Sequence, residues 1–291
     1  MDTNNGTHTS SNPKGSESLN SNDSSLVRVR CFRRSDLTAV RKICWECMVA
    51  CEGSPARVYL SKIMQKPSCR LAIALFVLSI AVEIATLFFF DSWRMNTSSA
   101  MNSFLGPSLS KIQVAIAATV TALFSFLYLC CAAYTTVGFY YEFYANSLRT
   151  DYNDPENYYE LRPASDGDVG KDPELEPIGK KGLWVAEIVS PKTGKPEVVG
   201  TITLDNAPSD FTKEPNVFEL RRMFVSHHHR NRGIAAALIR VCEAHARATK
   251  VSAILLRTTI YQAPARKLYE KYGYKKGSRA KGATVGMSKV R

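Results

Sequence analysis

The chain has 291 residues, of which 45% are hydrophobic and 22% charged, enough apolar content for a packed core in one or two domains. The formal net charge is +12, and its distribution is uneven: residues 217–291 carry 17 Lys and Arg against 3 Asp and Glu, whereas residues 142–216 carry 8 against 15. A basic carboxy-terminal part attracts a polyanion. Because no zinc-finger or RNP pattern accompanies it, nucleic acid is not expected as a partner.

The amino-terminal part divides into a tail and the start of a folded domain. Residues 1–25 are rich in Ser, Asn, Thr and Gly, a composition typical of disorder. Residues 26–33 alternate as a strand does, and Ser35 or Asp36 can cap a helix that follows. Residues 26–70 are therefore predicted to supply the first strand and helix of a domain.

Three cysteines of that helix, Cys44, Cys47 and Cys51, are spaced to share one helical face. They could form a metal or redox cluster, or the half-buried face of an ordinary helix. No second Cys pair supplies the remaining ligands of a zinc site, so packing is favoured and no metal site is expected.

Two long apolar runs follow. Residues 71–90 contain one charge and residues 112–141 contain none. Each is long enough to cross a hydrocarbon core of about 30 Å, so residues 71–141 are predicted to form a transmembrane hairpin. Two buried core helices are the alternative. A small excess of Lys and Arg before the first run favours a cytosolic location for both flanks.

The single charge in the first run, Glu83, has two interpretations. An acid within a membrane span can be a proton or ion site. It can also be a carboxyl group that is hydrogen-bonded to a Ser or Thr of the partner helix, which is favoured because one acid makes no pathway.

The rest of the chain contains an acidic stretch and then a series of alternating and periodic segments. Residues 142–182 are acidic, with Gly and Pro, and are predicted to be a linker. Residues 183–291 are predicted to form the core of the domain. The expected strands are 182–189, 198–204, 217–225, 251–258 and 284–290, with helices from Gly233 and over 262–272.

A basic glycine turn joins the 217–225 strand to the helix that follows. It reads Arg230-Asn231-Arg232-Gly233-Ile234-Ala235. A strand, such a turn and a helix N-terminus form a phosphate cradle, because backbone N–H groups and the positive end of the helix dipole converge there. The turn lacks the Gly-Lys-Ser/Thr of a P-loop and the G-x-G-x-x-G of a dinucleotide fold.

The Arg-x-x-Gly-x-Ala pattern resembles the coenzyme A loop of GNAT-type N-acetyltransferases. Gln262, Ala265, Tyr269 and Gly273 resemble a second helix motif of that family, with Gln262 in place of the usual Asn. With a hairpin inserted after the first helix, the chain is similar to the camello-like and N-acetylaspartate synthetase-like membrane subgroup. Further matches are Leu148-x-Thr150-Asp151, Tyr158-Tyr159, Trp184-Val185-Ala186, Glu219-Leu220-x-Arg222-Met223-x-Val225 and Leu268-Tyr269-Glu270.

The resemblance implies an α/β chain with an α+β GNAT fold, a mixed central sheet and an inserted two-helix hairpin. It implies a membrane-anchored enzyme that uses acetyl-CoA to acetylate a small amine, such as aspartate or a cysteine conjugate, or a protein lysine. It also implies the endoplasmic reticulum or another intracellular membrane, with the catalytic domain in the cytosol. A non-catalytic protein that keeps the fold as a CoA sensor or scaffold is the alternative.

The resemblance further implies roles for individual residues. A backbone N–H at Phe224 or Val225 would polarise the thioester carbonyl, and Tyr269 would donate a proton to the leaving thiolate. Glu219 is either the general base or part of a surface salt bridge to Arg221 or Arg222, and both interpretations stay open. Acetyl-CoA would be held by Arg230, Arg232, Gly233, Ile234, Ala235 and Gln262.

Overall fold

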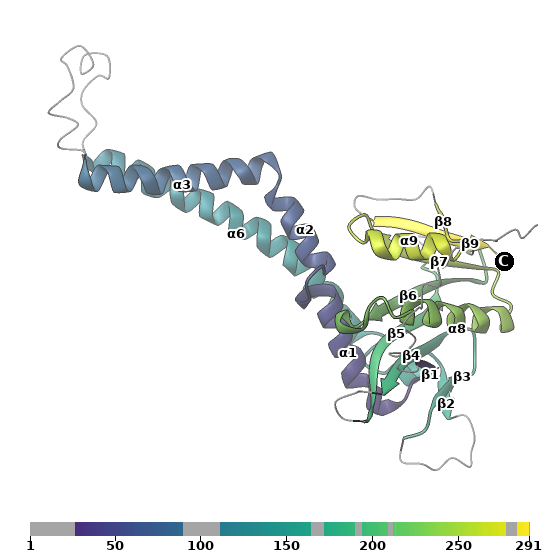
Figure 1. The fold of residues 1–291 in the computed structure, drawn as a ribbon. Coiled ribbons are helices and arrows are strands. Elements are labelled where there is room, and N and C mark those ends of the chain that lie inside the picture. Colours follow the sequence, from purple (N-terminus) through teal and green to yellow (C-terminus); the bar gives the residue numbers. More distant parts are fainter. Residues whose placement is uncertain are drawn as a thin grey trace, which may run out of the picture.

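The computed structural model of the chain describes residues 27–89, 111–163, 172–189, 194–208, 212, 214–277 and 284–290. The expected tail over 1–25 and the loop of the hairpin lie outside these residues. Within them, seven strands form a sheet in the order β1-β4-β5-β6-β7-β9-β8 (Figure 1). Only β6 and β7 pair in parallel, so the sheet is mixed, as expected. The strands are β1 Arg28–Cys31, β4 Gly182–Val189, β5 Pro196–Asn206, β6 Val217–Val225, β7 Ala253–Thr259, β8 Lys275–Lys276 and β9 Thr284–Val290.

Helices α8 (Ile234–Ala248) and α9 (Ala263–Lys271) cover one face of the sheet. In α8 the apolar residues recur every three or four positions, which gives the helix one buried stripe. That stripe packs on alternate residues of β4, β5 and β6, such as Trp184, Ile202 and Leu220. The α8 face of the sheet therefore holds the larger of the two apolar clusters.

The other face is covered by α1 (Leu37–Trp45), the π-helical turn η2 (Glu46–Ala50) and the carboxy-terminal part of α6 (Lys111–Arg149). A short helix α7 (Pro155–Tyr158) and a two-stranded sheet of β2 (Leu161–Pro163) and β3 (Leu175–Pro177) complete this layer. Its core is made of Phe32, Val40, Cys44, Tyr140, Tyr152, Tyr159, Leu161, Leu175, Leu183 and Val185, with smaller contributions from Met48 and Ala56.

The prediction of a linker over 142–182 is wrong for the described part of that segment. Tyr152, Tyr159 and Leu161 are fully buried. The acidic residues that suggested a solvated linker pair instead with arginines of other elements: Glu156 with Arg34, Glu174 with Arg33 and Asp151 with Arg222. Composition alone does not distinguish a solvated acid from a paired one.

Helix α2 (Pro55–Met64) was not predicted, although its start carries a clear signal. Ser54 is the N-cap and its hydroxyl accepts a hydrogen bond from the backbone N–H of Arg57 at 3.4 Å. Pro55 occupies the first turn, where its missing N–H costs nothing. Helix α2 joins the domain to the first apolar helix.

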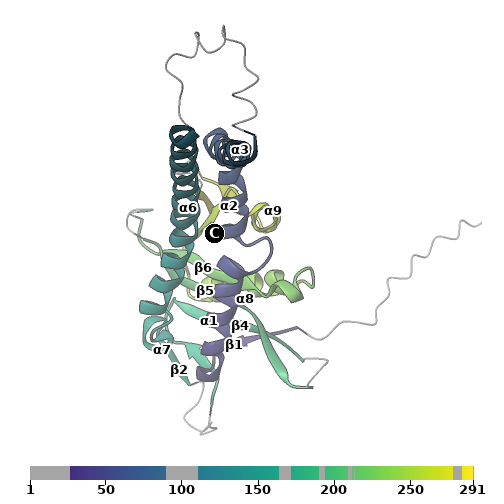
Figure 2. The same ribbon diagram turned by 90° about the vertical axis from the view of Figure 1, so that its left-hand side faces the viewer.

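Helices α3 (Pro67–Phe88) and α6 pack side by side and project away from the sheet (Figures 1 and 2). Both are long and apolar enough to cross a membrane by length and composition, and α3 spans about 33 Å. Only 17% and 11% of their most apolar windows is buried. The alternative of two buried core helices is therefore wrong.

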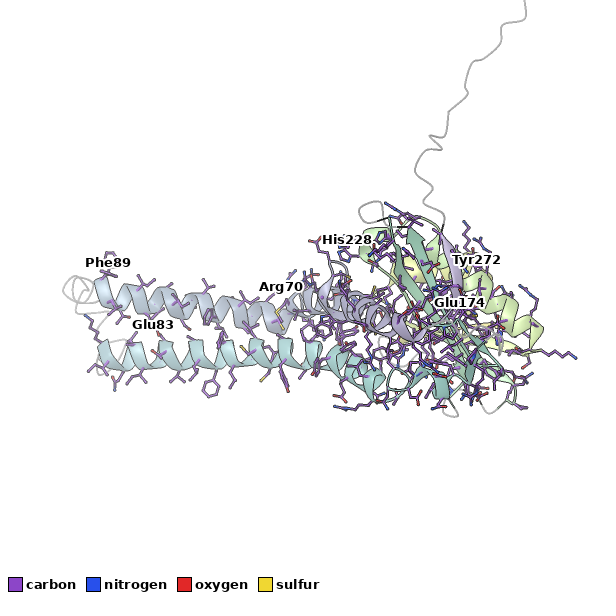
Figure 3. All side chains as sticks on the ribbon, turned by 90° about the horizontal axis from the view of Figure 1, so that it is seen from below. Arg70, Glu83, Phe89, Glu174, His228 and Tyr272 are labelled. Atoms are coloured by element: carbon purple, nitrogen blue, oxygen red, sulfur yellow. The ribbon has the colours of Figure 1, made fainter. Side chains whose placement is uncertain are left out.

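Glu83 lies in α3 on the side that faces α6 (Figure 3). The hydroxyl of Thr119 in α6 lies 2.8 Å from a carboxylate oxygen of Glu83 and 2.9 Å from the carbonyl oxygen of Ala115. The predicted hydrogen bond between Glu83 and a Ser or Thr of the partner helix is confirmed.

Candidate functional site

Two neighbouring strands of the sheet diverge, and a groove lies beside their divergent ends. In the described residues, β6 and β7 pair from Val217–Ala253 to Leu220–Leu256, after which both strands continue without pairing to each other. A groove of about 550 Å³ opens beside the divergent ends. Its walls are the end of β6, the loop and first turn of α8, the start of α9, and the junction between η2 and α2.

Most of the predicted cofactor residues line this groove, although they come from three separate segments. They are Phe224, Val225, Arg230, Gly233, Ile234, Ala235 and Gln262. Three predicted site residues do not line the groove. Arg232 is exposed, whereas Glu219 and Tyr269 are buried. Lining residues that were not predicted as site residues include Cys47, Pro55, Met223 and Tyr261. Of these four, only Met223 belongs to a family match in the sequence, and that match gives it no role.

A β-bulge sets which side chains of β6 face the groove. Arg222 has φ +50°, and the β5–β6 register shifts by one residue between Thr201 and Thr203. Before the bulge, Phe218 and Leu220 face α8. After the bulge, Met223 and Val225 face that side, whereas Phe224 faces the α6 layer. One extra residue thus reverses the alternation of the strand.

The backbone of Val225 points into the gap between β6 and β7. The N–H of Ser226 donates to the carbonyl of Val199 in β5 at 2.8 Å. Because the N–H and C=O of successive strand residues point in opposite directions, those of Val225 point away from β5. Of the two residues expected to present a backbone N–H to a thioester, Val225 therefore has the suitable orientation and Phe224 does not.

The glycine turn has the geometry of an anion cradle. Gly233 has φ +76° and is the N-cap of α8, whose Ala237 N–H bonds to the Gly233 carbonyl at 3.0 Å. No described side chain caps this terminus, and its first turn carries no acid. A Cβ at Gly233 would meet no atom within 4 Å, so the glycine is needed for its left-handed backbone conformation, not for space. The exposed Arg230 and Arg232 add positive charge.

Arg230 reaches inward toward two thiols. Its guanidinium lies 3.8 Å from Sγ of Cys51 and 4.0 Å from Sγ of Cys47, and its Nε lies 3.5 Å from the Val225 carbonyl. The Cys47 thiol donates to the same carbonyl at 3.2 Å. Burial raises the pKa of Cys47 to about 11, although Arg230 opposes the shift, so this thiol stays protonated. Cys44 lies in the core, as the packing interpretation expects.

Gln262 fastens the end of β7 to the start of α9. Its side-chain oxygen accepts hydrogen bonds from the hydroxyl of Thr258 at 3.0 Å and from the backbone N–H of Thr259 at 3.3 Å. The replacement of Asn by Gln therefore keeps an amide that lines the groove and holds the diverging strand.

Tyr269 lies behind the groove wall. It is 6% exposed, and its hydroxyl is 3.9 Å from Sδ of Met223, which does line the groove. Burial raises the pKa of Tyr269, so the phenol keeps its proton at neutral pH. The Met223 side chain therefore lies in contact with both the groove and the Tyr269 hydroxyl.

Glu219 is buried in an ion-pair network on the opposite face of the sheet. Both of its carboxylate oxygens accept hydrogen bonds from Arg257, at 2.7 and 3.2 Å, and Arg221 lies 3.7 Å away. The salt-bridge interpretation is correct for Arg221 but wrong for Arg222 and for the surface location, since the Glu219 side chain is 4% exposed. Arg222 instead forms a buried bidentate pair with Asp151 at 2.8 Å.

The three consecutive histidines form a 3-10 turn, His227–His229, before the glycine loop (His228 is labelled in Figure 3). His229 lines the groove, and its buried Nδ1 has no hydrogen-bond partner. Burial lowers the pKa of His229, and the positive charge of Arg232 adds to the effect, although Glu197 opposes it. Among the described residues, no three His, Cys, Asp or Glu side chains are grouped as a metal ion requires.

Comparison with known proteins identifies the domain. Residues 145–274 match the model of the acetyltransferase (GNAT) family. This part of the chain is a GNAT acetyltransferase domain. It is 36% identical over 129 residues to N-acetylaspartate synthetase of Xenopus tropicalis and 33% identical over 130 residues to that of Danio rerio. These matches cover 44% and 45% of this chain but only 38% and 36% of the relatives' own length.

Among solved structures, a GNAT-family acetyltransferase from Staphylococcus aureus Mu50 is 18% identical, covers 50% of this chain and 78% of its own, and has a TM-score of 0.36. The PaiA N-acetyltransferase of Thermoplasma acidophilum, solved with coenzyme A, is 17% identical and has a TM-score of 0.31. The match covers 38% of this chain and 61% of the PaiA chain. Acetyl-CoA is the co-substrate that the family uses.

Proposed function

We propose that the chain is a membrane-anchored N-acetyltransferase that moves an acetyl group from acetyl-CoA to a primary amine. The observation that carries this proposal is the groove at the divergence of β6 and β7, where the backbone of Val225 and the uncapped N-terminus of α8 converge. The groups that line the groove match the chemistry of acetyl-CoA. Backbone N–H groups and arginines can bind the pyrophosphate, and the strand edge that is left unpaired where β6 and β7 diverge can hydrogen-bond to the amides of the pantetheine.

In this proposal Gly233, Ile234 and Ala235 hold the pyrophosphate with backbone N–H groups, and Arg230 and Arg232 supply positive charge. The Val225 N–H stabilises negative charge on the carbonyl oxygen of the thioester. Bound acetyl-CoA supplies the activated acyl group, and the amine attacks it directly. Gln262 keeps the β7 end of the groove in position.

Two residues have proton-transfer roles in the proposal. Tyr269 donates a proton to the departing thiolate, which requires the Met223 side chain to move aside. Glu219 is a base only if Arg257 releases one of its oxygens, because both are hydrogen-bonded to that guanidinium. A water molecule is the alternative proton acceptor, and we favour it while the Glu219–Arg257 pair is intact.

The acceptor is a small amine such as aspartate or a cysteine conjugate, or a protein lysine. The relatives named N-acetylaspartate synthetase support the first class. The test is the turnover of acetyl-CoA by the purified full-length chain with aspartate, a cysteine S-conjugate and a lysine peptide, with the acetylated amine detected by mass spectrometry. Tight acetyl-CoA binding without acetylation of any of the three would favour a CoA sensor or scaffold instead.

Membrane anchoring is proposed from helices α3 and α6. Their apolar side chains are exposed along the hairpin, from Leu71 at 60% to Phe88 at 75% in α3. Lys62, Lys66 and Arg70 flank the end next to the domain (Arg70 in Figure 3), which favours a cytosolic location for that end. On α6 the exposed Tyr134 and Phe139 suit the interface of the same leaflet.

This part of the proposal is tested on the full-length chain in cells. It should stay in the membrane fraction after an alkaline carbonate wash, and it should co-localise with a marker of the endoplasmic reticulum or another intracellular membrane. Extraction by carbonate would contradict the transmembrane hairpin. Tags at the two termini should both be accessible after selective permeabilisation of the plasma membrane.

A further inference from the structure

Met223 is the residue of β6 that lines the groove nearest to the point where β6 and β7 pair. Met223 lines the groove and also packs against the apolar cluster under α8 and α9. Its Sδ lies 3.9 Å from the hydroxyl of Tyr269. Tyr269 itself is buried and lies outside the groove lining. Met223 is therefore part of the wall between the groove and the core, and its sulfur contacts the Tyr269 hydroxyl behind that wall.

The backbone fixes the direction of this side chain. The bulge at Arg222 directs Arg222 to the α6 layer, where Asp151 holds it with two hydrogen bonds at 2.8 Å. The next residue, Met223, consequently faces α9. Without the bulge a regular alternation would direct Met223 to the opposite face. The buried ion pair thus fixes where the groove ends.

The position of Met223 along β6 matches the place where an acyl group would lie. It is between Leu220, the last residue paired with β7, and Val225, whose backbone points into the gap. With the pyrophosphate at the glycine turn, as proposed above, a thioester that reaches the Val225 N–H directs its acyl end away from that turn, toward the point where the strands join. Along β6, Met223 is the groove-lining residue closest to that point.

We propose that Met223 sets the upper size limit of the acyl group, and so restricts the donor to short acyl-CoA thioesters. The proposal rests on the acyltransferase function proposed above. An acetyl group needs no space beyond Met223, whereas each further methylene would displace its side chain toward Tyr269. A methionine has three rotatable bonds and can yield partly, so the limit is graded. Removal of the Met223 side chain would extend the groove by the volume that this side chain occupies next to the Tyr269 hydroxyl.

The test compares acetyl-CoA, propionyl-CoA and butyryl-CoA as donors for the wild type, Met223→Ala and Met223→Leu. One methylene in an apolar pocket changes kcat/KM by roughly 10- to 200-fold. We expect Met223→Ala to raise the ratio of kcat/KM for butyryl-CoA over acetyl-CoA by about 10-fold or more. Met223→Leu, which conserves volume, should leave this ratio within about 3-fold of the wild type. Because each ratio is measured on one preparation, a loss of folded protein does not change it.

An unchanged ratio in Met223→Ala would overturn the proposal. If Met223→Ala does not fold, Met223→Val provides the smaller deletion, and the same ratio must rise with it. If the wild type turns over none of the three acyl-CoA thioesters, the proposed function has failed. The size limit is then tested separately, by calorimetric measurement of the affinity for each thioester. Equal discrimination against butyryl-CoA by the wild type and Met223→Ala in that binding assay would also reject the role of Met223.

Discussion

The substitution Gly233→Glu tests the anion cradle most directly. Gly233 is exposed, has φ +76° and begins α8, and a side chain at this position would meet no atom within 4 Å. Any non-glycine residue pays for the left-handed conformation, about 1–2 kcal/mol. A glutamate adds a negative charge at the N-terminus of the helix, where the pyrophosphate is proposed to bind.

The size of the charge effect follows from Coulomb's law. Two unit charges about 5 Å apart repel by about 0.8 kcal/mol at the dielectric constant of water and by about 3 kcal/mol at an effective value of 20. The groove mouth is exposed, so the first value is the better guide. With two phosphate charges, affinity should fall by about 1.6 kcal/mol, which is roughly 15-fold.

Gly233→Ala is the matched control, because it carries the same backbone strain without the charge. Calorimetric titration with acetyl-CoA should give an affinity for Gly233→Glu roughly 15-fold below that of Gly233→Ala at low salt. High salt should reduce the difference, because exposed charges are screened. An affinity of Gly233→Glu equal to that of Gly233→Ala at low salt would refute the assignment of the cradle. A melting temperature common to both variants would show that the fold is intact.

Three further predictions concern Tyr269, Asp151 and His229. Tyr269→Phe should lower kcat by about 10²-fold with little change in KM for acetyl-CoA or in melting temperature, whereas a purely structural tyrosine would change the melting temperature and spare kcat. Burial alone would raise the pKa of Asp151, but the hydrogen bonds and the charge of Arg222 outweigh this effect, and the pKa is lowered. The ionised Asp151 therefore stabilises the fold above about pH 4, and this stabilisation is lost as the pH falls further. Asp151→Asn should cost about 3–5 kcal/mol of unfolding free energy at neutral pH, and denaturation curves at pH 7 and pH 3 should differ less for the variant than for the wild type. The pKa of His229 is lowered by burial in the free protein, and a bound anion would raise it, so the affinity for coenzyme A should increase as pH falls from 7.5 to 5.5 by more in the wild type than in His229→Gln; equal pH slopes in calorimetry would exclude His229 from the site.

The elements with strong periodicity were predictable from sequence. The strands over 182–189, 217–225 and 284–290 and the helix that begins after Gly233 lie where the apolar patterns predict them. These segments bury one stripe or alternate residues against a single layer, so the local pattern reports the tertiary environment. The two apolar helices were predictable from the length of their uninterrupted apolar runs. Helix α6 extends to Arg149 because its last turns pack on the domain.

Other parts of the fold depend on long-range pairs that the sequence does not display. The segment over 142–182 was misjudged because Asp151, Glu156 and Glu174 find arginine partners more than 70 residues away in the chain. Arg257 was not expected as a partner of Glu219, since the two meet only when β6 and β7 pair in parallel. Such ion pairs have no local sequence pattern.

The location of the groove shows why the site was only partly predictable. A strict alternation through β6 directs Phe218, Leu220, Arg222 and Phe224 to the same face, which would bury a guanidinium among the apolar side chains under α8. The bulge avoids that cost, because it sends Arg222 to Asp151 in the other layer. The same displacement directs Met223 and Val225 toward the groove and leaves the Val225 N–H free of β5. The placement of one buried charge therefore determines which backbone N–H faces the divergence, and the glycine turn by itself does not reveal it.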